Sequence, residues 1–120
     1  MLKVKIDSVD VSVLWEKNES VEALRTIACK APVNISTKMY GGFEQVGELG
    51  TALPHSDTEI TSAPGDILLY CGSMIVLFYG KNTWSYTRLG RITGKTSEEL
   101  KELLGKEHVT VSITSENTEK

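Results

Sequence analysis

The sequence has few of the side chains that cross-link a chain or bind a metal. Its 120 residues include only two cysteines and two histidines. A chain of this length can bury a core without a disulfide, so we interpret Cys29 and Cys71 as free thiols. His55 and His108 are far apart in the sequence, and the glycine-rich stretches lack the following Lys-Ser/Thr of a phosphate loop. We therefore expect no metal site and no cofactor.

An excess of positive charge and a long apolar run are also missing. The formal net charge is -3 and the isoelectric point is about 5.4, whereas binding to a phosphate backbone depends on clustered Lys and Arg. No apolar stretch approaches the length of a membrane span. The first residues alternate apolar and polar side chains and lack the continuous apolar run of a signal peptide. We expect a cytoplasmic protein that binds neither nucleic acid nor a membrane.

The composition that is present is typical of one globular domain. Hydrophobic residues make up 40% of the chain and charged residues 24%, which suffices for a single core. We expect residues 1–114 to form this domain. Residues 115–120 are polar, and we expect them to form a flexible C-terminal tail.

Two stretches carry helix signals at both ends. Asn18 precedes an apolar pattern at helical spacing, which the Ala31-Pro32 pair ends. Thr96 and Glu99 form a capping box for a second helix, which Gly105 ends. Each helix has an apolar stripe that must cover part of the core. The stripes comprise Val21, Leu24, Ile27 and Ala28 in the first helix and Leu100, Leu103 and Leu104 in the second.

Alternating patterns and short apolar runs predict strands along the rest of the chain. Pro64-Gly65-Asp66 predicts a turn, because proline fixes φ and glycine adopts a positive φ. The segment from Lys38 to Leu53 contains four glycines, and we expect its backbone to be irregular. The predicted strands cover residues 2–6, 11–15, 33–35, 67–70, 74–79, 86–92 and 109–113.

These seven or eight short strands and two helices predict a mainly β domain. Helices do not separate every pair of strands, as they would in a parallel α/β sheet. Closing an antiparallel sheet removes the exposed edges that many short strands otherwise present. We therefore predict an antiparallel β-barrel closed by helices.

Four segments carry a resemblance to a known family. They are Tyr40-Gly-Gly-Phe-Glu-Gln-Val-Gly, Pro64-Gly-Asp-Ile-Leu-Leu-Tyr, Met74-Ile-Val-Leu-Phe-Tyr-Gly and Ser85-Tyr-Thr-Arg-Leu-Gly-Arg-Ile. On these segments the chain resembles the prokaryotic cyclophilin-like domain family over nearly all of residues 2–113. The resemblance implies a closed eight-stranded antiparallel cyclophilin-like β-barrel with two short capping helices. A fold alone does not assign a function.

The resemblance raises the question of prolyl isomerase activity, which must overcome a barrier of roughly 18–20 kcal/mol. Cyclophilin enzymes place an arginine at the prolyl nitrogen and a glutamine nearby. The resemblance puts Lys38 at the arginine position, and lysine lacks the rigid donor fork of a guanidinium. It puts Met74 at the glutamine position, where a thioether donates no hydrogen bond. We expect at most a weak isomerase, with Lys38 as the only candidate for a catalytic residue.

Aromatic and apolar side chains in the same segments predict a groove that holds a proline or another flat apolar group. Met74 and Val76 share one face of their strand, and Ile75 and Leu77 share the other. The sequence leaves open which of these two faces points outward. The predicted ligand-binding residues are Phe43, Tyr70, Met74, Val76, Trp84 and Tyr86.

We therefore predict a binding module that recognises a small apolar ligand or an extended, proline-containing peptide without efficient catalysis. One alternative is a weak peptidyl-prolyl cis-trans isomerase that uses Lys38. A second alternative is an accessory subunit that docks on another protein. The sequence indicates neither the ligand nor the oligomeric state.

Four polar residues near these segments are interpreted as surface groups. We expect Glu44 and Gln45 to be exposed, because charged and amide side chains are rarely buried. Arg88 and Arg91 flank Gly90 in an alternating strand, and we expect both to point outward.

The segment His55-Ser56-Asp57 contains the residue types of a nucleophilic triad. Neighbours in one loop rarely have the spatial order of nucleophile, base and orienting acid, so we expect no catalysis from them. Cys71 has no cationic neighbour in the sequence that would activate it, and we expect an inert thiol.

Overall fold

The structure is a computed structural model that describes residues 2–115. This range contains nine strands and two helices. In chain order they are β1 (Leu2–Ile6), β2 (Val9–Trp15), α1 (Glu19–Lys30), β3 (Val33–Tyr40), β4 (Glu44–Glu48), β5 (Thr58–Thr61), β6 (Asp66–Tyr70), β7 (Met74–Phe78), β8 (Thr83–Thr93), α2 (Ser97–Leu104) and β9 (His108–Ser115).

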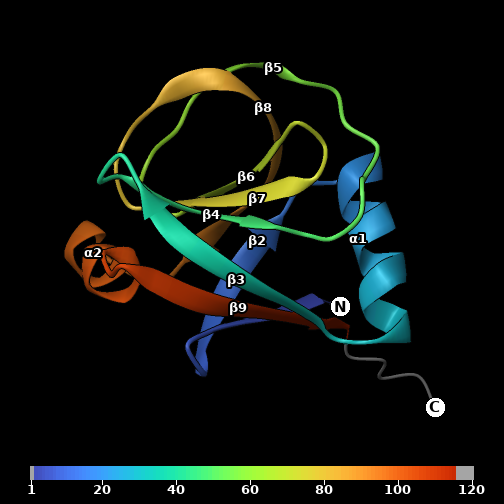
Figure 1. The fold of residues 1–120 in the computed structure, drawn as a ribbon, viewed down its shortest axis with the longest axis horizontal. Helices are drawn as coiled ribbons and strands as arrows, with labels where there is room; N and C mark the ends of the chain where they lie inside the picture. The colour runs from blue at the N-terminus through green and yellow to red at the C-terminus, as the bar shows by residue number, and fades with distance from the viewer. Residues whose placement is uncertain (1, 116–120) are drawn as a thin grey trace.

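Eight of these strands close into an antiparallel barrel (Figure 1). Their order around the barrel is β2-β1-β9-β3-β4-β7-β6-β8, and the pairing of β8 with β2 completes the ring. β5 lies outside the ring and pairs only with the first part of β8, from Thr83 to Tyr86. The predicted closed eight-stranded barrel is confirmed, with one additional strand paired to the first part of β8.

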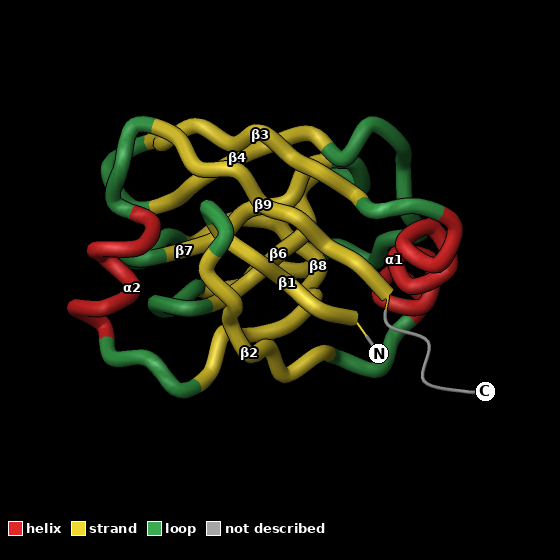
Figure 2. The backbone as a smooth tube through the Cα atoms, turned by 90° about the horizontal axis from the view of Figure 1, so that it is seen from below, coloured by secondary structure: helices red, strands yellow, loops and turns green. Residues whose placement is uncertain are grey.

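The two helices lie at opposite sides of the barrel (Figures 1 and 2). Val21 and Leu24 of α1 and Leu100 and Leu104 of α2 are buried in the same core as the inward side chains of the strands. Burial of the apolar stripes supplies most of the stability of helices this short. Both helices therefore plug the barrel, as the resemblance implied.

The predicted helix caps are present. The Asn18 Oδ1 accepts a hydrogen bond from the Val21 N–H at 2.9 Å, and the Asn18 Nδ2 donates to the Arg88 carbonyl at 2.8 Å. Thr96 and Glu99 form the capping box of α2, and Gly105 is its C-cap. The Asn18 side chain thus both starts α1 and fastens that start to β8.

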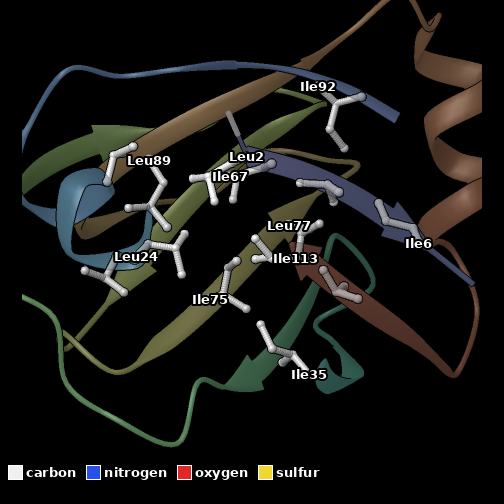
Figure 3. Close-up of a cluster of buried hydrophobic side chains, with 14 of the residues drawn as sticks. Leu2, Ile6, Leu24, Ile35, Ile67, Ile75, Leu77, Leu89, Ile92 and Ile113 are labelled. Atoms are coloured by element: carbon white, nitrogen blue, oxygen red, sulfur yellow. The ribbon is translucent and has the colours of Figure 1, made fainter. Parts of the chain in front are cut away.

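The two faces of the β6–β7 hairpin enter different cores. Ile75 and Leu77 point into the interior of the barrel, where they meet side chains such as Leu24 and Ile113 (Figure 3). Val76 lies on the opposite face, in a second cluster outside the barrel that also contains Leu68, Phe78 and Tyr86. The outward pair is therefore Met74 and Val76, which the sequence left undecided.

The expectation of irregular backbone from Lys38 to Leu53 is wrong for half of the segment. β3 continues to Tyr40, and β4 occupies Glu44–Glu48. Gly47 lies within β4, where a Cβ atom would approach the Ile35 Cγ2 to 2.6 Å and the Ser36 carbonyl oxygen to 2.7 Å. Glycine is required there by the close approach of two strands rather than by a turn.

The chain ends and the short strand β5 differ in smaller ways from expectation. β9 extends to Ser115, and residues 116–120 of the predicted tail lie outside the described residues. β5 was not predicted, because its sequence Thr-Glu-Ile-Thr has a single apolar residue. Among the helices in the described range, none is long and apolar enough to cross a membrane.

Candidate functional site

A groove of about 510 Å³ lies on the outside of the barrel, over the outer face of β4, β6 and β7 and the first part of β8. Its volume falls within the range of roughly 300–1,000 Å³ that is common for ligand pockets. The residues that line it are Tyr40, Phe43, Glu44, Val46, Tyr70, Met74, Val76, Asn82, Trp84 and Tyr86.

All six predicted ligand-binding residues lie together in this lining. Val76 forms the floor, since it is buried in the outer cluster. Tyr70 and Met74 face each other across the β6–β7 hairpin, and Tyr86 and Trp84 come from β8. Phe43 comes from the turn between β3 and β4. Residues from four separate segments thus meet at one place.

Two glycines hold Phe43 in the groove wall. Gly41 and Gly42 have φ values of 67° and 75°, a region that glycine adopts without steric penalty. A Cβ at Gly41 would lie 2.2 Å from the Cε2 of Phe43, so the ring occupies space that only glycine leaves empty. The Phe43 carbonyl accepts hydrogen bonds from Tyr79 N–H and Gly80 N–H at 2.9 and 3.0 Å. The turn and the following strand end therefore fix the ring in place.

Tyr86 organises the aromatic side of the groove. Its ring makes edge contacts with Tyr70 and Phe78, at centroid distances of 6.1 and 5.6 Å. Its hydroxyl accepts a hydrogen bond from the Asn82 Nδ2 at 2.9 Å. Trp84, two residues earlier in β8, is 58% exposed. The groove thus has a rigid, packed interior and one large indole at its rim.

Lys38 does not line the groove. It is exposed on β3, where it lies opposite Val46 of β4 and His108 of β9. Val46 is the nearest lining residue in this row of the sheet. The structure thus places the predicted catalytic candidate beside the groove rather than among its walls.

Glu44 lies in the groove wall, and the expectation that it is exposed is wrong. It is 6% exposed, and no described residue forms a hydrogen bond with its buried Oε1. Burial raises the pKa of the Glu44 carboxyl to about 7. The sequence signal for this position is the spacing of Glu44 and Val46, which are two residues apart and therefore share a face of β4.

Two tyrosines interact electrostatically with Glu44. Burial raises the pKa of Tyr79, and the Glu44 charge raises it further. Burial also raises the pKa of Tyr86, which the hydrogen bond from Asn82 partly offsets and to which Glu44 adds. Both phenols therefore stay neutral in the range where Glu44 titrates.

Gln45 is fully buried, which again corrects the expected exposure. It points into the barrel, the opposite direction from Glu44. Its Nε2 donates to the carbonyls of Leu104 and Lys106 at 2.8 and 2.6 Å, and its Oε1 accepts from the Thr37 hydroxyl at 2.9 Å. Gln45 therefore fastens the end of α2 to the barrel and is a structural residue.

Arg88 and Arg91 are partly exposed, as expected, but both pair with a buried carboxylate that the sequence did not reveal. Asp66 is 0% exposed, and its Oδ1 lies 2.9 Å from the Arg91 Nε and 3.3 Å from the Arg88 Nη1. Its Oδ2 accepts a hydrogen bond from the Ala63 N–H at 2.9 Å. This cluster pins the predicted turn at residues 64–66 to β8.

Hydrogen bonds attach the His55-Ser56-Asp57 segment to Thr87 of β8. The His55 Nδ1 lies 3.2 Å from the Asp57 Oδ1, which also accepts a hydrogen bond from the Thr87 hydroxyl at 2.7 Å. Ser56 contributes its backbone N–H, which donates to the Thr87 Oγ1 at 2.9 Å. Within residues 2–115 no hydrogen bond joins a serine hydroxyl to His55, so the segment does not form a nucleophilic triad.

Metal-binding clusters and thiols add no second site in residues 2–115. No group of three or more His, Cys, Asp or Glu side chains gathers in this range. Cys29 and Cys71 are exposed free thiols.

Comparison with known proteins places the whole barrel in one family. Residues 4–114 match the Cyclophilin-like family. The fold is similar to the solution structure of the hypothetical protein AF2241 from Archaeoglobus fulgidus, with a TM-score of 0.61 and 18% sequence identity. That similarity covers 96% of this chain and 93% of the archaeal protein. No curated protein matches the sequence.

Proposed function

The chain belongs to the cyclophilin-like family, and from this premise we propose that its outer groove binds a small apolar ligand or the apolar part of an extended peptide without efficient catalysis. The observation that carries the proposal is the convergence of Phe43, Tyr70, Trp84 and Tyr86 on one open volume of about 510 Å³. Four aromatic rings facing solvent-accessible space give a ligand large apolar contacts.

The layout of the groove favours binding over the alternatives. Its interior is held by edge contacts between rings and by the Phe43 turn, so a ligand meets a wall that is already ordered. Preorganised walls lower the entropic cost of association. Trp84 at the rim is 58% exposed, and burial of an indole is a frequent source of binding energy.

Efficient prolyl isomerisation lacks a guanidinium or ammonium donor in the groove lining. None of the described residues that line the groove is an arginine or a lysine. Lys38 lies outside this set, and the carboxyl of Glu44 accepts hydrogen bonds when it is ionised, whereas the prolyl nitrogen needs a donor. A barrier of roughly 18–20 kcal/mol then stays largely in place.

Thermal denaturation with added ligand tests the binding proposal. The probes are an acetylated Ala-Pro-Phe amide and benzyl alcohol, each at rising concentration. A ligand that binds only the folded chain raises its melting temperature. We expect a concentration-dependent rise for the wild type and for Leu14→Ala, a matched control because Leu14 is 69% exposed on β2, away from the groove lining. Trp84→Ala should lose most of the rise, and an undiminished rise in Trp84→Ala would place binding elsewhere.

An isomerisation assay on the same proline peptide tests the absence of efficient catalysis. We expect the rate with the purified chain to equal the uncatalysed rate. Turnover above this background that falls on Lys38→Ala would support the isomerase alternative and contradict our proposal. If neither probe binds and no turnover occurs, docking on another protein becomes the better interpretation of the groove.

A further inference from the structure

The groove contains one acidic group and no basic group. Of its ten lining residues, Glu44 is the only one with a carboxyl, and the lining has no lysine, arginine or histidine. The Glu44 Oε1 is buried without a hydrogen-bond partner, and within residues 2–115 no basic side chain lies within ion-pair distance of the carboxyl. No described residue therefore neutralises the charge of this carboxylate.

A buried carboxylate without a hydrogen-bond donor or a counter-ion lowers the stability of the folded protein. Buried polar groups are almost always hydrogen-bonded, and buried charges are almost always paired. Gln45, its neighbour, follows this rule with three bonded partners. Glu44 departs from the rule, and it does so at the wall of a groove open to ligands.

The remaining walls also suit a positive charge. Five of the ten lining residues are aromatic: Tyr40, Phe43, Tyr70, Trp84 and Tyr86. The face of an aromatic ring carries partial negative charge and attracts cations, most strongly for tryptophan. The carboxylate of Glu44 and the five aromatic rings that line the same cavity therefore both favour a positively charged ligand.

We propose that the ligand of the groove is a small organic amine, whose protonated nitrogen pairs with Glu44 and whose apolar body packs against the aromatic walls. This inference rests on the proposed binding function and narrows it to a ligand class. The ammonium group supplies the hydrogen-bond donors that the Glu44 Oε1 lacks. A neutral apolar ligand of the same shape fills the groove but leaves that oxygen unpartnered.

Binding of such an amine depends on pH through Glu44. The titratable side chains near the carboxyl are Tyr40 on β3, Tyr70 on β6, Tyr79 after β7 and Tyr86 on β8, and the exposed Lys38 lies two residues before Tyr40. Burial raises the pKa of Glu44 to about 7, so the carboxyl is ionised above neutral pH and protonated below it. The amine should therefore bind more tightly as the pH rises through 7.

The test compares benzylamine with benzyl alcohol, which have the same number of heavy atoms and differ in charge. Isothermal titration at about pH 8 should give a dissociation constant roughly ten-fold lower for benzylamine, as a hydrogen-bonded ion pair in a partly buried site implies. At about pH 5.5 benzylamine is still protonated, but Glu44 is then mostly neutral, and the preference should fall several-fold. Benzyl alcohol has no charge to pair with Glu44, so its affinity should change less between the two pH values than that of benzylamine.

Glu44→Gln removes the charge while keeping the shape of the side chain. This variant should bind benzyl alcohol as the wild type does and should lose the preference for benzylamine. Equal affinity of the wild type for both probes at about pH 8 would overturn the amine inference and leave the proposed apolar groove standing. Failure of both probes to bind would overturn both proposals. The pH series on the wild type decides the question even if Glu44→Gln folds poorly.

Discussion

Two carboxylates are buried on the outer face of this barrel, and their surroundings are opposite. Asp66 in β6 meets two guanidinium groups and a backbone N–H. Glu44 in β4 has a buried oxygen with no partner in the described chain. Phe78 links the two places in the sheet. It pairs with Glu44 across β4 and β7, and its carbonyl accepts a hydrogen bond from the N–H of Gly65, the residue before Asp66.

The two carboxylates are buried for different reasons, one structural and the other functional. Asp66 is neutralised within the chain, so its role is complete in the folded protein. Glu44 is neutralised only by a proton or by a group from outside. The same residue chemistry thus stabilises the fold at one point of the sheet and prepares a binding site at another.

The largest effect should come from Asp66→Ala. The change leaves the Ala63 N–H without its acceptor and separates Arg88 and Arg91 from their shared partner. Because both arginines are partly exposed and can be solvated, we expect a loss of about 3 kcal/mol in the free energy of unfolding, the low end for a broken buried pair. Urea denaturation measures it, and a loss below about 0.5 kcal/mol would show that the cluster is not structural.

Glu44→Gln should have the opposite sign. Burial raises the pKa of Glu44 from 4.5 to about 7. The folded state is therefore favoured while the carboxyl is protonated, below about pH 4.5, and this contribution is lost as the pH rises to about 7. We expect the variant to be more stable than the wild type by about 2 kcal/mol at about pH 8 and equally stable at about pH 4. Urea denaturation of both proteins at the two pH values checks this, and a difference that does not change with pH would contradict it.

The smallest effect on stability should come from Trp84→Ala. Because the side chain is mostly exposed, we expect a loss below about 1 kcal/mol, although the variant should lose ligand binding. Thermal denaturation without ligand measures the first quantity. A large loss would mean that the indole is part of the core. Trp84 would then be a structural residue and not only a binding residue of the groove.

The sequence predicts those parts of the fold whose signals are local. Asn18 and the Thr96–Glu99 box mark helix starts through hydrogen bonds within three residues. The alternation in β1 and the apolar runs of β6 and β7 identify strands by their own residues. The number of short strands favoured a closed barrel, and the family resemblance added the count of eight strands. The pairing between β2 and β8 that completes the ring is invisible in either strand alone.

The parts that were missed depend on contacts between distant segments. β4 reads as Glu-Gln-Val-Gly-Glu, which has no apolar pattern, although its first four residues are buried or half-buried in the folded chain. Glu44 lines the groove, Gln45 donates from its amide to the end of α2 and to Lys106 just after it, and Gly47 makes room for β3. The aromatic groove residues were predicted from the resemblance, but the acid among them was not.

The most direct test of whether Glu44 is a buried carboxyl that pairs with an amine is its own titration. Nuclear magnetic resonance of the ¹³C-labelled Glu44 carboxyl, recorded across pH, should give a midpoint at about 7 in the free protein. Saturating benzylamine should lower this midpoint by about one unit, which corresponds to a ten-fold preference of the amine for the ionised carboxylate. A midpoint near the ordinary value of 4.5, or one that benzylamine leaves unchanged, would contradict the account.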